Sequence, residues 1–148
     1  MMKTILTLID FSDVTLRLIE QSRRLAAAFQ SRVILLHAVP PEAVVLDLGI
    51  VSPTVMHAPS GKRIASDFAK LTELRDSLAS SGIEVTAQQL DDTSIEKVVE
   101  VIRDVVPDLV IVGSHHHGCL FTLLAGTYTS DVLKRADCPV LVVPAGRP

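Results

Sequence analysis

The stretch PDLVIVGS at residues 107–114 decides the fold class. Its centre, residues 109–112, is a continuous apolar run that is too short for a helix and shows no alternation with polar residues. Such runs are typical of strands that are buried on both faces of a parallel sheet. Similar short apolar runs occupy residues 3–9, 33–36 and 140–143, and we expect a strand in each.

Helical patterns separate these strands. Apolar side chains recur at helical spacing in residues 14–29, 64–78, 95–106 and 127–136. Residues 83–90 alternate between apolar and polar instead, which predicts a strand at the edge of the sheet. The order β-α-β-(loop)-α-β-α-β-α-β predicts an α/β fold in which residues 1–148 form a single domain. Its sheet would be parallel and doubly wound, with right-handed crossovers.

Polar residues near the element ends suggest how the helices begin. Ser12 or Asp13 is expected to cap the first helix. Thr93 and Glu96 have the spacing of a capping box for the third helix. His37 stands at the end of a buried apolar run, and we expect it to be a structural histidine with hydrogen-bond partners.

A long segment between the second strand and the second helix breaks the alternation. Residues 40–60 include Pro40, Pro41, Pro53 and Pro59, which exclude one regular helix through the segment. The segment is nevertheless rich in aliphatic residues. We expect a long irregular insertion that partly covers the core, with a ligand lid or an interface arm as the alternatives.

The composition excludes several classes of protein. Hydrophobic residues make up 48% of the 148 residues, which is enough aliphatic surface for a packed core and excludes a disordered chain. Aromatic residues make up only 3%, which argues against a base-stacking platform. The net charge is −3 and no basic patch is visible, so neither nucleic acid nor a membrane surface is an expected partner.

The cysteines and the apolar runs indicate where the protein works. Cys119 and Cys138 are too few for a disulfide scaffold and lack the spacing of a CxxC metal site. No apolar run is long enough to cross a membrane, and the first residues do not have the pattern of a signal peptide. We therefore expect a cytoplasmic protein.

Candidate ligand-binding residues follow the strands, because ligands of open α/β sheets bind beyond the carboxyl ends of the strands. Asp10 follows the first strand, where its carboxylate could accept hydrogen bonds from a ligand or could face the start of a helix. Gly113 ends the fourth strand, and Gly126 and Thr127 stand at the start of the last helix. Backbone N–H groups and a helix dipole at these positions could hold phosphate.

Six stretches of the chain together resemble a known family. They are residues 5–10, VILLHAV at 33–39, PDLVIVGSH at 107–115, LLAGT at 123–127, VL at 132–133 and CPVLVVP at 138–144. In this order they resemble the universal stress protein family. The resemblance implies a five-stranded parallel sheet of order 3-2-1-4-5 with helices on both faces. It also implies a homodimer formed through the last strand, residues 140–143, whose apolar edge would otherwise be open.

One branch of this family binds ATP through the pattern Gly-x-x-Gly, nine residues, then Gly-Ser/Thr. The resemblance maps this pattern onto Gly113, His116, Gly126 and Thr127, with histidine in place of the second glycine. It also implies that Asp10 contacts the adenine. An imidazole at position 116 either donates to a phosphate or closes the phosphate site. The complete set of expected nucleotide-site residues is Asp10, Ala38, Val112, Gly113, Ser114, His116, Gly126, Thr127 and Tyr128.

Three functions follow from these observations. The first is a homodimeric stress-response sensor that binds ATP or AMP, with or without Mg²⁺, and hydrolyses it very slowly or not at all. The second is a nucleotide-free dimeric scaffold in which His116 blocks the phosphate site. The third is a metal-binding module that uses His115, His117 and Cys119. No catalytic residue is predicted, because neither a GxSxG elbow nor an HExxH motif is present.

Overall fold

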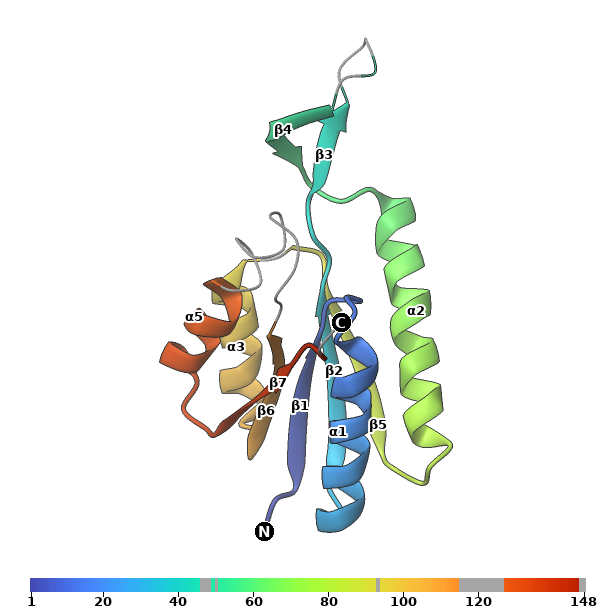
Figure 1. Cartoon of the computed structure of the whole chain (residues 1–148), viewed down its shortest axis with the longest axis vertical. Coiled ribbons are helices and arrows are strands. Elements are labelled where there is room, and N and C mark those ends of the chain that lie inside the picture. The colour runs from blue at the N-terminus through green and yellow to red at the C-terminus, as the bar shows by residue number, and fades with distance from the viewer. Residues whose placement is uncertain (46–48, 50, 93, 115–126, 147–148) are drawn as a thin grey trace.

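The computed structural model describes residues 1–45, 49, 51–92, 94–114 and 127–146. Its main sheet is parallel and has five strands in the order β5-β2-β1-β6-β7 (Figure 1). Numbered along the chain without the separate hairpin β3–β4, this order is 3-2-1-4-5, which confirms the prediction. The strands are β1 (Thr4–Ile9), β2 (Arg32–Ala38), β5 (Val85–Leu90), β6 (Leu109–Ser114) and β7 (Val140–Pro144).

Helices cover both faces of this sheet. The helices α1 (Thr15–Phe29) and α2 (Gly61–Ala79) lie on one face, and α3 (Ile95–Val105) and α5 (Thr127–Arg135) lie on the other (Figure 1). Each face has its own apolar core, one around Leu18 and Leu71 and the other around Val98 and Val132. The predicted doubly wound α/β architecture is therefore confirmed. None of the described helices is both long and apolar enough to span a membrane.

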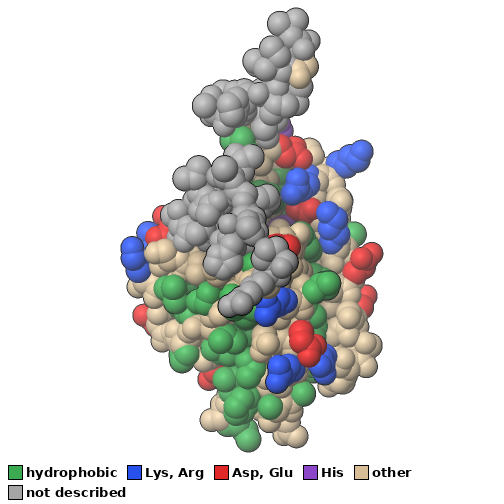
Figure 2. All heavy atoms as spheres, in the orientation of Figure 1, with side chains coloured by type: hydrophobic (Ala, Val, Ile, Leu, Met, Phe, Trp, Pro, Cys, Tyr) green, Lys and Arg blue, Asp and Glu red, His purple; other side chains and the backbone are tan. Residues whose placement is uncertain are grey.

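The sequence patterns of the strands match their places in the sheet. The continuous apolar runs form the inner strands β1, β2 and β6, which are buried on both sides. The alternating run forms β5, which lies at one edge as predicted. The other edge is β7, whose first three residues are half-buried, and hydrophobic side chains are visible on the face of the sheet beside α1 (Figure 2).

The predicted cap of the first helix is wrong, and one residue of the capping box predicted for the third helix lies outside the described residues. The first helix begins after Val14, which makes no side-chain capping bond, while the Ser12 carbonyl accepts the Thr15 N–H at 3.1 Å. The turn before it is organised differently, because the Asp10 carboxylate accepts the Ser12 N–H at 3.0 Å. The third helix begins after Ser94, whose hydroxyl donates to Glu96 at 2.9 Å, and Thr93 lies outside the described residues.

The insertion is not irregular throughout. It contains an antiparallel hairpin of β3 (Glu42–Val45) and β4 (Val51–His57), which stands beyond the carboxyl edge of the main sheet (Figure 1). Pro53 lies within β4, inside the segment that was expected to be irregular. A two-stranded sheet consists of edge strands only, and proline is tolerated on an edge because it need not donate to a neighbouring strand. The described part of the segment contains no helix, as predicted.

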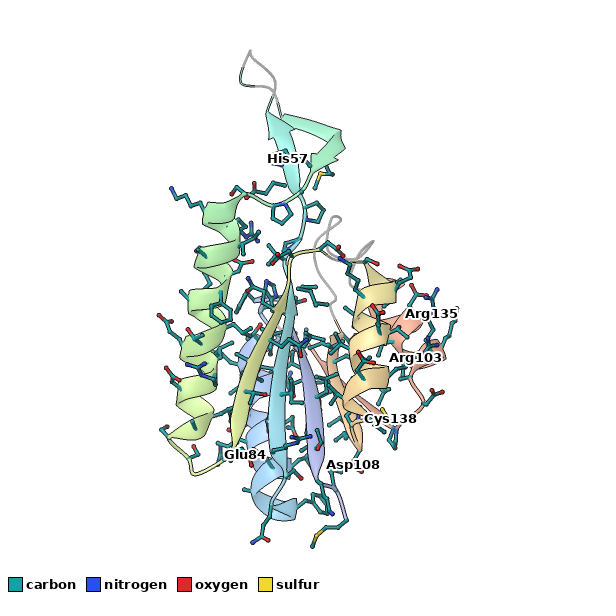
Figure 3. All side chains as sticks on the ribbon, turned by 180° about the vertical axis from the view of Figure 1, so that it is seen from behind. His57, Glu84, Arg103, Asp108, Arg135 and Cys138 are labelled. Atoms are coloured by element: carbon teal, nitrogen blue, oxygen red, sulfur yellow. The ribbon has the colours of Figure 1, made fainter. Side chains whose placement is uncertain are left out.

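Asp108 links the start of β1 to the turn before β6. Its carboxylate accepts the backbone N–H groups of Lys3 at 2.8 Å and Thr4 at 2.9 Å, at the end of the sheet opposite the hairpin (Figure 3). These two hydrogen bonds, together with the nearby positive charges, hold the pKa of Asp108 below its ordinary value.

We expect Asp108→Asn to lower the stability in a pH-dependent way. A carboxylate whose pKa is lowered on folding stabilises the protein above its unfolded-state pKa of about 4, and this contribution is lost as the pH falls. Urea unfolding of both proteins should show a clear difference in midpoint at neutral pH that shrinks in acid. Equal differences at both pH values would contradict this assignment.

Candidate functional site

The carboxyl ends of β1 and β2 bring Asp10 and Ala38 together. Ile9 pairs with His37 in the register of these parallel strands. Asp10 directly follows Ile9 at the end of β1, and Ala38 directly follows His37 as the last residue of β2. On the other side of β1 lies β6, which ends with Val112, Gly113 and Ser114. The strand order reverses between β1 and β6, so this edge is the topological switch point at which open α/β sheets bind ligands.

Packing against the start of α1 leaves no room for a side chain at Gly113. A Cβ atom at this position would lie 2.5 Å from Cγ1 of Val14 and 3.6 Å from Cδ1 of Leu18. The close approach of α1 to the end of β6 therefore depends on the missing side chain. The sequence pattern suggested only that this glycine opens the backbone to an anion.

The start of α5 is attached to the end of β6 through Thr129. Its hydroxyl donates to the Gly113 carbonyl at 3.0 Å, so the first turn of α5, which begins at Thr127, lies beside the end of β6. A helix N-terminus offers unpaired N–H groups and the positive end of the helix dipole to an anion. Thr129 was not among the predicted site residues, although a hydroxyl in the first turn of a helix is a recognisable signal.

Several predicted residues cannot be placed. His116 and Gly126 lie outside the described residues, and Thr127 and Tyr128 are described only as the first turn of α5. The candidate metal ligands His115, His117 and Cys119 also lie outside them. Among the residues that the structure does describe, no group of three or more His, Cys, Asp or Glu side chains could hold a metal ion.

A buried ion pair lies beneath the ends of β1 and β2. His37 is 1% exposed, and its Nδ1 atom is 2.6 Å from the carbonyl oxygen of Ile9. Its Nε2 atom is 2.9 Å from Oδ2 of Asp67, a fully buried residue of α2. The expectation of a hydrogen-bonded structural histidine is confirmed, whereas Asp67 was not predicted to take part.

Asp67 is ionised despite its burial. Burial disfavours the charged form, but hydrogen bonds from His37 and Arg63 outweigh it and hold the pKa of Asp67 below its ordinary value. The Nε atom of Arg63 is 3.0 Å from Oδ1 of Asp67, and Nζ of Lys70 is 4.0 Å from the same oxygen. Basic and acidic side chains gather around the start of α2, below the hairpin (Figure 2).

The model of the universal stress protein family matches residues 1–144. The chain belongs to the universal stress protein family. It is 26% identical over 141 residues to universal stress protein MJ0531 of Methanocaldococcus jannaschii, a match that covers 90% of this chain and 77% of the relative. It is 31% identical over 74 residues to universal stress protein MJ0577 of the same organism, covering 50% of this chain and 46% of the relative.

Solved structures of this family have the same fold. The structure of MJ0577 has a TM-score of 0.76 at 23% identity and covers 100% of this chain and 99% of that one. A universal stress protein in complex with cAMP has a TM-score of 0.69 at 22% identity, with 98% of each chain covered. One from Archaeoglobus fulgidus in complex with dAMP has a TM-score of 0.65 at 15% identity, covering 96% of this chain and 97% of that one.

The described part of this universal stress protein also has a hollow at the other end of the sheet. It encloses about 350 Å³ between the end of α1 and the start of β5, and Arg32, Gly82 and Glu84 are among its lining residues. It contains none of the predicted nucleotide-site residues. The candidate site is therefore defined by strand ends and a helix start.

Proposed function

We propose that this universal stress protein binds an adenine nucleotide, AMP or ATP, at the carboxyl ends of β1, β2 and β6. One observation carries the proposal: Asp10 and Ala38 directly follow the paired residues Ile9 and His37, while Gly113 and the first turn of α5 stand on the other side of β1. A base on one side and phosphates on the other would fit this arrangement. Family members of the same fold in complex with cAMP and dAMP support the ligand class.

Each part of the nucleotide has a candidate partner. The Asp10 carboxylate would accept a hydrogen bond from the adenine amino group, and the Ala38 backbone would contact the ring. Backbone N–H groups near Gly113 and at the start of α5 would hold the phosphates.

The cellular role that we infer is a cytoplasmic stress-response sensor that does not depend on catalysis. Fast phosphoryl transfer requires a cation that neutralises charge on the transferred phosphate. The predicted phosphate loop, GSHHHGC at residues 113–119, contains neither lysine nor arginine. Occupancy by the nucleotide, rather than its hydrolysis, would then carry the signal.

His116 is the residue that tests the phosphate part of this proposal. Glycine at position 116 restores the nucleotide-binding pattern of the family, so we expect His116→Gly to tighten AMP binding by about tenfold or less. Titration calorimetry of both proteins measures the difference. Weaker binding by the variant would show instead that the imidazole itself helps to hold the phosphate.

The second candidate function is a nucleotide-free scaffold. The histidine at position 116, which stands where the family pattern has glycine, favours this function. Mass spectrometry of gently purified protein separates the two functions. AMP, ADP or ATP that co-purifies with the chain supports the sensor. An empty protein that also fails to respond to added nucleotide supports the scaffold.

We also propose a homodimer formed through β7. This strand is an open edge of the sheet, and Val140, Leu141 and Val142 are only half-buried in the single chain. An apolar edge strand favours pairing with another strand. Sedimentation at low micromolar concentration should give the mass of a dimer, and Val142→Lys should shift it toward the monomer. A wild-type monomer at that concentration would contradict edge pairing.

A further inference from the structure

We propose that the buried His37–Asp67 pair is the positioning element of the adenine site. This inference rests on the proposed function, because it concerns the residues that are expected to contact the nucleotide. Neither member of the pair is among the predicted contacts, and both are buried beneath the site. They would act by holding Asp10 and Ala38 in place.

The histidine controls the backbone on both sides of Asp10. Its Nδ1 atom is 2.6 Å from the carbonyl oxygen of Ile9, the residue before Asp10. Its ring packs against the ring of Phe11, the residue after Asp10, with 4.4 Å between the ring centroids and an angle of 55°. Ala38 follows His37 directly in β2. The imidazole therefore contacts both neighbours of Asp10 and belongs to the residue that precedes Ala38.

The backbone at Phe11 needs this support. Phe11 has a φ of 58°, in the left-handed region that residues other than glycine rarely adopt. Such conformations persist only where the surroundings impose them. The surroundings include the apolar core, the His37 ring and Lys70, whose Nζ lies 5.6 Å from the centroid of the Phe11 ring. Loss of these contacts would let the turn that carries Asp10 relax.

Both ring nitrogens of His37 face oxygen atoms. Nδ1 lies beside the Ile9 carbonyl, which accepts hydrogen bonds. Nε2 lies beside the carboxylate of Asp67. Together these two contacts hold the orientation of the buried ring. Asp67→Asn would replace one carboxylate oxygen by an amide nitrogen and so weaken the contact that orients the ring.

Other charged and polar groups surround the His37–Asp67 pair. Arg63 and Lys70 of α2 approach the second oxygen of Asp67, and Asp10 follows the segment bonded to His37. On the β5 side the residue paired with His37 is the uncharged Gln89. Buried ion pairs seldom add much net stability compared with apolar residues. A role in orienting the site gives a physical reason for a charged pair at this position.

The test compares a change in affinity with a change in stability. We expect Asp67→Asn to weaken AMP binding by about tenfold in titration calorimetry at a temperature where the protein is fully folded. The control is Leu78→Ala, on the same helix but about 16 Å away by helical rise, in the core and outside the network. It should lower the melting temperature and leave the AMP dissociation constant within about twofold.

A milder variant keeps the test decisive if Asp67→Asn does not fold. Arg63→Gln removes the guanidinium from Oδ1 of Asp67 at a side chain that is 42% exposed, and should weaken AMP binding by about threefold. Wild-type affinity in a folded network variant would overturn the positioning role while leaving nucleotide binding intact. Equal loss in Leu78→Ala would also overturn it, because loss of stability would then explain the effect. A wild-type protein that does not bind AMP would overturn both proposals.

Discussion

Replacing Asp67 by alanine is expected to lower the free energy of unfolding by about 3–5 kcal/mol. The carboxylate is fully buried and accepts hydrogen bonds from His37 at 2.9 Å and Arg63 at 3.0 Å. Its removal leaves Nε2 of the buried imidazole facing a small cavity without its hydrogen-bond partner. Breaking one side of a buried pair is costly for this reason, even where the intact pair adds little.

Urea unfolding at neutral pH measures this loss, and Asp76→Ala provides a matched control on the same helix. The Asp76 side chain is 70% exposed and pairs only with its neighbour Arg75 among the described ion pairs. Its replacement should change the free energy of unfolding by about 0.5 kcal/mol or less. A loss below about 1 kcal/mol for Asp67→Ala would show that the His37–Asp67 contact is not a buried ion pair.

Gly113→Ala is expected to cost about 1–3 kcal/mol, the usual range for an added carbon in a packed core. The new Cβ would lie 2.5 Å from Cγ1 of Val14, so either α1 or the end of β6 must move. Because Thr129 holds the start of α5 to the Gly113 carbonyl, a shift of β6 would also disturb the proposed phosphate site.

A double-mutant cycle identifies the cause of this loss. Val14→Ala removes the atom that the new Cβ would meet, so the double variant Val14→Ala/Gly113→Ala should lose less stability than the sum of the single variants. The coupling expected for residues in contact is about 0.5–3 kcal/mol. Additive losses would show that the contact between the new Cβ and Val14 is not the cause of the loss.

Much of the fold could be predicted because its signals are local. The apolar runs at β1, β2 and β6 and the alternation at β5 each identify a strand and its depth in the sheet. The apolar run at β7 identifies the strand but not its depth, because β7 is a half-buried edge strand. The hairpin was missed because the prolines of residues 40–60 were used only to exclude a helix, and the segment was expected to be irregular. Pro53 is tolerated in β4 because both strands of a two-stranded sheet are edges.

The buried face of α2 was predicted only in part. Leu71 and Leu78 are buried as their spacing indicates, but Phe68 is 43% exposed and Asp67 takes the inward position beside it. Of two neighbouring residues such as Asp67 and Phe68, the spacing pattern predicts that the apolar one faces the core. Asp67 faces inward because its partner His37 lies 30 residues earlier in the chain, and a contact over that separation leaves no periodic signal.

The candidate site was predictable to the extent that parallel strands determine it. Asp10, Ala38 and Gly113 follow or end neighbouring strands, and the rule for ligand sites in open α/β sheets places them at one edge. The packing role of Gly113 and the bond from Thr129 could not be predicted, because they depend on how closely α1 and α5 approach β6.

Titration of the wild-type protein with AMP, and in parallel with ATP, tests the central claim most directly. We predict saturable binding of one nucleotide per chain. At a free concentration about 100 times the dissociation constant, the stabilisation of about 2.7 kcal/mol should raise the melting temperature by roughly 5–10 °C. No heat of binding and no shift in melting temperature with either nucleotide at millimolar concentration would contradict the proposed adenine-nucleotide site.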